Sequence, residues 1–179
     1  MTELYVKLLR DAGLTVDWKT VAVGWHGFSG VRMGYFSLPS SQLQEYALEC
    51  LATASLEEED LLFRIADDDD SWKKQDTEYA LETLSARTTI TEEMAYRKWR
   101  YAWLMTYSRA FTGYTGDDPH EKFYDQEAIY EACEAWELEE EWLEWSKSSE
   151  GVGDSLSHLR QWLELEAETL RKAIGEPVS

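Results

Sequence analysis

The chain has 179 residues and a formal net charge of −19 at pH 7, from 36 acidic and 17 basic residues. Phosphate backbones and anionic lipid surfaces bind Lys and Arg, so this charge argues against direct nucleic-acid binding and against membrane association. No stretch approaches the roughly 20 apolar residues of a membrane span, and two isolated cysteines, Cys50 and Cys133, suit a reducing compartment. We therefore expect one folded cytoplasmic domain over residues 1–179, with free thiols.

Apolar residues recur at helical spacing from the start of the chain, and strand-like alternation is almost absent. The pattern predicts a helix over 2–12 that ends at Gly13, and a second helix with Asp17 as its N-cap. The glycine-rich segment 26–41 is typical of a loop that can include a short extended piece.

The next helices are predicted from their capping residues. A helix over 42–53 is expected to begin at Ser40 or Ser41. Ser55 and Glu58 form a capping box at the start of the helix that follows. The Asp run 67–70 interrupts the helical pattern, and because it lacks the alternating ligands and the Gly of a calcium loop, we expect it to be solvated.

A helix over 77–87, with Tyr79, Ala80 and Leu84 spaced to pack, precedes the longest predicted helix, residues 92–111. Thr89 and Glu92 have the spacing of a capping box at its start. Its apolar residues cover too much of the circumference for a surface helix, so it is predicted to be central, with Trp103 and Leu104 buried.

The basic cluster Arg97, Lys98 and Arg100 lies in this long helix, and we expect it to pair with the acid-rich C-terminal half of the chain. After a turn at 113–119, helices are predicted over 120–136, 138–147 and 154–173. The sequence therefore predicts an all-α, single-domain bundle of about eight helices around the helix near 92–111.

No motif for catalysis, cofactor binding or metal binding occurs in the sequence. It contains no G-x-S-x-G nucleophile turn and no P-loop. None of the three histidines (His26, His120 and His158) follows a Glu by three residues, as the ligands of a di-metal bundle would. We therefore expect no catalytic, cofactor or metal residues, and a protein that is not an enzyme.

The predicted helices between 120 and 147 carry the strongest charge signal. Between Lys122 and Lys147 there is no cation, and glutamates recur at i, i+4 and i+7, where each like-charge pair costs a few tenths of a kcal/mol, about 0.2–0.5. An acidic ridge beside a partly exposed Trp suits the binding of a basic protein. We call these residues the acidic ridge: Glu127, Glu131, Glu134, Glu137, Glu141, Glu144 and Trp145.

Three stretches resemble a family of uncharacterised bacterial proteins, a domain of unknown function. They are VDWKTVAVGWHG, SSQLQEYALECL, and the segment from DDP to EEEWLEW. The matching positions of the last segment are Asp118, Pro119, Glu121, Glu127, Ile129 and Tyr130. The resemblance covers about 17–150, and after Trp136 a Tyr-Pro step of the family is replaced by Glu-Leu-Glu. It implies similarity to small acidic immunity proteins of bacterial toxin systems.

Charge and resemblance together favour a binding protein that neutralises a basic protein partner, most concretely an immunity protein whose toxin is a nuclease with a cationic groove. The alternative is a DNA-mimicking inhibitor or adaptor of another nucleic-acid-binding protein. A third interpretation of the charge is that it only maintains solubility.

Overall fold

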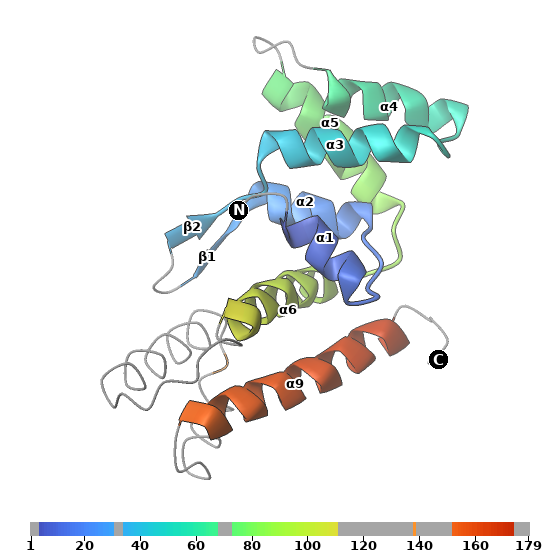
Figure 1. The fold of residues 1–179 in the computed structure, drawn as a ribbon. Helices are drawn as coiled ribbons and strands as arrows, with labels where there is room; N and C mark the ends of the chain where they lie inside the picture. Colours follow the sequence, from blue (N-terminus) through green and yellow to red (C-terminus); the bar gives the residue numbers. More distant parts are fainter. Residues whose placement is uncertain (1–3, 31–33, 68–72, 111–137, 139–151, 174–179) are drawn as a thin grey trace.

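The protein has an all-α, multi-helix fold, as the sequence predicts, and the described residues also include one short hairpin (Figure 1). The structure is a computed structural model and describes residues 4–30, 34–67, 73–110, 138 and 152–173. In Figure 1, α3, α4 and α5 gather at one end, α1 and α2 lie in the middle, and α6 and α9 run side by side at the other end. The helices among the described residues are α1 (Leu4–Asp11), α2 (Trp18–His26), α3 (Ser40–Leu51), α4 (Leu56–Ala66), α5 (Lys73–Ala86), α6 (Glu92–Ala110) and α9 (Val152–Ala173).

The turn from α1 to α2 confirms both of its predicted signals. Gly13 has φ 71°, a left-handed conformation that suits glycine, and the Leu14 N–H donates to the Leu9 carbonyl over 2.9 Å in a Schellman-type end. Asp17 caps α2, because its carboxylate accepts the Thr20 N–H at 2.9 Å and the Thr20 hydroxyl at 3.0 Å. These contacts end α1 and start α2 within a few residues of each other.

The segment between α2 and α3 contains the extended piece that the sequence allowed. Strands β1 (Phe28–Gly30) and β2 (Gly34–Phe36) pair antiparallel, with Phe28 opposite Phe36. The predicted serine cap of α3 is wrong. Pro39 occupies the N-cap and its carbonyl accepts the Gln42 and Leu43 N–H groups, so the helix starts at Ser40 without a side-chain cap.

Helix α4 begins as predicted, with the Ser55 N–H and hydroxyl both donating to the Glu58 carboxylate at 3.0 and 2.8 Å. Helix α5 starts four residues earlier than predicted. Its buried side is formed by Ala80 and Leu84, whereas Tyr79 is exposed. Successive helical residues are about 100° apart, so Tyr79 projects away from the side that packs on the other helices.

Helix α6 is the central helix, as predicted, and contacts α1, α2 and α9. Its start differs in detail, because Thr91 rather than Thr89 accepts the Met94 N–H, at 3.1 Å. Leu104 is fully buried, but Trp103 is only partly buried, so that part of the prediction is wrong. Among the described tryptophans, Trp99 is the fully buried one and binds α2 through the Thr20 carbonyl, whereas Trp103 lies about one turn further along α6.

Gly24 of α2 and Trp99 of α6 approach each other closely in the core. The indole Nε1–H of Trp99 donates to the Thr20 carbonyl over 2.7 Å, which holds the ring against the helix backbone. A Cβ atom at Gly24 would lie 2.3 Å from the ring carbon Cζ2 of Trp99. Position 24 therefore needs glycine for close approach, since both helices would have to move apart for any larger residue.

We predict that Gly24→Ala destabilises the protein by about 1–3 kcal/mol through overpacking, although Ala normally favours a helix over Gly by about 1 kcal/mol. Urea unfolding followed by tryptophan fluorescence measures the change. In a Trp99→Leu background the same substitution should have a much smaller effect. Equal effects in both backgrounds would show that the ring does not set the requirement for glycine.

Candidate partner-binding surface

The acidic ridge lies outside the described residues: Glu127, Glu131, Glu134, Glu137, Glu141, Glu144 and Trp145. Its predicted role therefore stays a prediction. The one described residue within this part of the sequence, Leu138, is fully buried in the same hydrophobic core as α6 and α9. What the structure describes is how the rest of the chain distributes its charges.

Two cations of α6 bind one carboxylate of α9. Arg97 donates to both oxygens of Glu166, at 2.9 and 2.6 Å, and Arg100 approaches the same carboxylate at 3.4 Å. Glu166 is only 6% exposed, and the Arg100 guanidinium also lies 5.2 Å from the ring centroid of Trp162. The predicted pairing of these two arginines with the acidic C-terminal half is confirmed, and it joins α6 to α9.

The third cation of the cluster, Lys98, pairs elsewhere, so its prediction is wrong. Lys98 is fully buried and points to the other side of α6, where its ammonium donates to the Asp17 carboxylate and to the Thr15 carbonyl, both at 2.7 Å. Asp17 therefore caps α2 and binds α6 at once. A buried charge is tolerated only with such partners, which makes this contact a fixed point of the fold.

We predict that Asp17→Ala costs about 3–5 kcal/mol of stability, because it leaves the Lys98 ammonium buried without a counter-charge. Ser55→Ala, which removes a cap that holds no cation, should cost only about 1 kcal/mol. Chemical denaturation of both variants makes the comparison. The double variant Asp17→Ala with Lys98→Met should recover part of the loss, and a strictly additive double variant would contradict the coupling.

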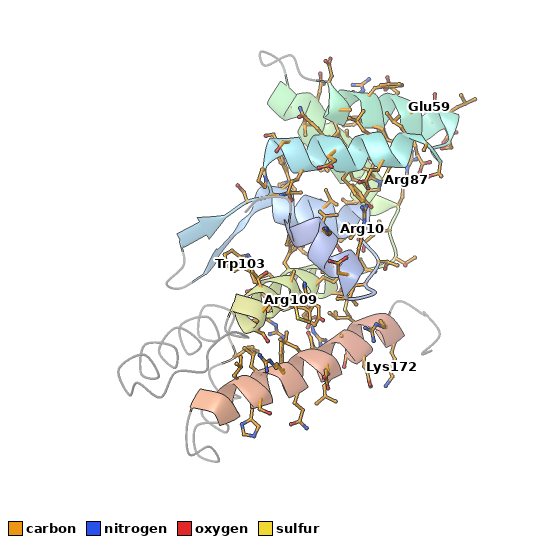
Figure 2. The ribbon with its side chains drawn as sticks, in the orientation of Figure 1. Arg10, Glu59, Arg87, Trp103, Arg109 and Lys172 are labelled. Atoms are coloured by element: carbon orange, nitrogen blue, oxygen red, sulfur yellow. The ribbon has the colours of Figure 1, made fainter. Side chains whose placement is uncertain are left out.

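Several other described cations are also paired with carboxylates within the molecule. Surface pairs of this kind contribute only about 0–1 kcal/mol each to stability, but they cancel positive charge at the surface. Carboxylates outnumber cations, so the surplus charge is negative. The exposed pairs, several of whose members are labelled in Figure 2, are Arg10 with Glu49, Arg64 with Asp60 and Asp76, Arg87 with Glu58, and Lys172 with Glu168.

Helix α4 shows the surplus most clearly. Its first turn carries three glutamates, 57–59, where the helix dipole favours negative charge. Hydrogen bonds from the Ser55 backbone and side chain lower the pKa of Glu58, so this carboxylate stays ionised. Leu56 and Phe63, 86% and 59% exposed, lie two turns apart on the same helix. Single exposed apolar side chains are normal at a protein surface, so these two do not mark a binding site by themselves.

Two grooves accompany these charges. A cavity of about 470 Å³ between α6 and α9 has mixed charge, with Arg109, Arg160 and Arg171 alongside Glu164 and Glu168 (Arg109 is labelled in Figure 2). A cavity of about 400 Å³ lies between α1 and α3. Its lining residues are Val6, Lys7, Arg10, Asp11, Gln42, Glu45, Tyr46 and Glu49.

Sequence reasoning missed this second groove. It joins residues 6–11 to residues 42–49, and no local pattern connects them. One signal was present: Gln42 shares a helical face with the buried Leu43 and Tyr46, so a polar residue occupies a core-facing position of α3. A polar residue at a core-facing position of a helix can indicate a binding site.

The described cysteine, Cys50, is a free thiol at the C-terminal end of α3. Burial raises its pKa above the usual value, and the nearby Glu49 charge adds to this effect. The thiolate is the reactive form, so a raised pKa lowers reactivity.

We therefore predict that Cys50 in the folded protein reacts with iodoacetamide at pH 8 several-fold more slowly than a cysteine in an unstructured peptide. The rate should rise as the pH increases beyond the usual cysteine range. Mass spectrometry of the peptide that contains Cys50 measures the rate separately from Cys133, and protein in urea serves as the control. Equal rates in folded and unfolded protein would contradict the prediction.

Within the described part of the chain, no group of three His, Cys, Asp or Glu residues could hold a metal ion. None of the described helices is both long and apolar enough to cross a membrane.

Comparison with known proteins identifies a family. Residues 6–167 match the family described as an uncharacterized protein conserved in bacteria (DUF2247). No curated protein and no solved structure matches the chain. The match covers most of the sequence, so the chain belongs to this bacterial family, in agreement with the resemblance found in the sequence.

Proposed function

We propose that the protein is a non-catalytic binding protein that captures and neutralises a basic protein partner. The observation that carries the proposal is the surplus of negative charge. The chain has 36 acidic and 17 basic residues. In addition, Arg97, Lys98 and Arg100 are bound to carboxylates within the fold and so are not displayed to a partner. A surface of one sign attracts partners of the opposite sign and speeds their association.

The most concrete form of this function is a cytoplasmic immunity protein that inactivates a bacterial toxin. A nuclease toxin fits the charge best, because its active-site groove must be cationic to bind phosphate. The acidic ridge supplies the spacing of carboxylates, and Trp145 supplies an aromatic anchor of the kind that contributes most to interface affinity. The ridge would occupy the groove that receives nucleic acid.

We predict that replacing Glu127, Glu131, Glu134 and Glu141 with Gln leaves stability unchanged or slightly raised, because like-charge repulsion is removed. The same variant should bind its partner more weakly, mainly through slower association. The difference from wild type should shrink at high salt, since screening acts within about 8 Å at physiological ionic strength. Surface plasmon resonance at several salt concentrations measures both rates.

The matched control replaces Glu57, Glu82, Glu92 and Glu93 with Gln, which removes the same charge from exposed positions elsewhere. If both variants lose association rate equally, only net charge matters and the ridge has no special role. If neither loses it, the charge serves solubility alone and the proposal fails.

A pull-down with the product of the neighbouring gene identifies the partner class. Capture of a toxin, and protection of cells that express it, supports the immunity role. Capture of a restriction or repair enzyme instead would support the alternative, a DNA-mimicking inhibitor.

A further inference from the structure

The groove between α1 and α3 contains a buried polar side chain that the fold does not use. Gln42 is 6% exposed, and neither its Oε1 nor its Nε2 has a hydrogen-bond partner among the described residues. An unpaired buried amide destabilises a protein, and an apolar residue of the same shape would not. Gln42 also lines the 400 Å³ groove, and both of its amide atoms are almost closed off from water, so a bound group reaches them after the side chain rotates toward the groove.

The wall beside Gln42 is held in place by its own contacts. The Tyr46 hydroxyl donates to the Val16 carbonyl at 2.8 Å, and the edge of the Trp18 ring packs on Tyr46 with the centroids 4.9 Å apart. The Arg10 guanidinium lies 5.7 Å from the Tyr46 centroid and is paired with Glu49. Tyr46 and Arg10 therefore already have partners and shape the wall of the groove, whereas the buried Gln42 amide has none among the described residues.

The charges of the groove favour a cationic occupant by a small margin. Two cations, Lys7 and Arg10, face three carboxylates, Asp11, Glu45 and Glu49. The charges of Arg10 and Glu49 cancel each other, because the two side chains form an ion pair. Asp11 and Glu45 are exposed and form no ion pair within the described part of the chain, so two carboxylates remain against one lysine.

The chemistry of the amide indicates what kind of group it would recognise. A glutamine side chain presents one carbonyl acceptor and an NH₂ donor side by side. This arrangement matches the N–H and C=O groups of a main-chain peptide, and uncommitted carboxylates nearby suit a Lys or Arg side chain. A cavity of this size is in the range of about 300–1,000 Å³ that is usual for binding pockets.

We propose that the groove between α1 and α3 binds a peptide segment of a protein partner, with Gln42 bonded to a main-chain peptide group and with Asp11 and Glu45 receiving an adjoining Lys or Arg side chain. The proposal rests on the proposed function, because it specifies a second contact point for the basic partner. This contact recognises the partner's main chain by hydrogen bonds as well as its charge. It therefore adds selectivity to the long-range attraction of the acidic surface.

The test uses the full-length ¹⁵N-labelled protein and three probes in NMR titrations. The probes are acetyl-Gly-Lys-Gly-amide, acetyl-Gly-Glu-Gly-amide and butylammonium. The lysine peptide should shift the Gln42 side-chain NH₂ signals and the backbone signals of α1 and α3 in a saturable manner. Butylammonium, which has the charge without peptide groups, and the glutamate peptide should both bind at least tenfold more weakly.

The variant Gln42→Leu should raise the melting temperature, because the unpaired amide is removed, and should weaken binding of the lysine peptide at least tenfold. The matched control is Gln161→Leu, an exposed glutamine on α9, which should leave binding unchanged. Because the variant is expected to be more stable, a loss of binding cannot be attributed to unfolding.

Three outcomes would overturn the proposal: equal binding of butylammonium and the lysine peptide, stronger binding of the glutamate peptide, or Gln42→Leu binding the lysine peptide like wild type. Its failure is distinguishable from failure of the proposed function. If the ridge variant associates more slowly with the partner but no peptide binds in the groove, the groove proposal fails and the proposed function stands. If the peptide binds in the groove but the ridge variant associates with the partner as fast as wild type, capture by the charge of the ridge is contradicted and the groove proposal stands.

Discussion

The contact between Gly24 and the indole of Trp99 determines how closely α2 and α6 pack, and the neighbouring contacts depend on that distance. The Trp99 bond to the Thr20 carbonyl and the Lys98 bond to Asp17 both join the N-terminal half of α2 to α6. Each is a buried polar contact that needs its partner within about 3 Å. A shift of α6 away from α2 would break both at once, so the close approach and the two bonds stabilise one another.

The same helix reconciles a strongly acidic composition with a stable fold. Helix α6 directs Lys98 to one side, toward Asp17, and Arg97 and Arg100 to another, toward Glu166 of α9. Three cations are thus placed where charges are least screened and bind the helices together. The other described carboxylates are exposed or partly exposed, so water solvates them. The excess of acidic residues is thus compatible with a stable fold, and we propose that it serves to bind a partner.

The two proposed sites would act at different ranges. A ridge of carboxylates acts over roughly a Debye length, about 8 Å at physiological salt, and mainly affects the rate of encounter. The Gln42 amide acts only in contact and only on a group with the matching donor and acceptor. A binding protein with both features would associate quickly with basic proteins in general. It would bind most tightly the one whose peptide segment fits the groove.

The sequence by itself determined the helical class, the C-terminal end of α1, the caps at Asp17 and Ser55, and the position of the central helix, because these depend on neighbouring residues and on helical period. Only the tertiary structure decided that Trp99 rather than Trp103 fills the core, since α6 is apolar around much of its circumference and its orientation depends on α2 and α9. It likewise decided that Lys98 pairs with Asp17, because the direction of each α6 cation follows from that orientation. The groove around Gln42 joins residues more than 30 positions apart, between Asp11 and Gln42. Periodicity assigns a residue to a face of its own helix, and only packing determines what lies opposite that face.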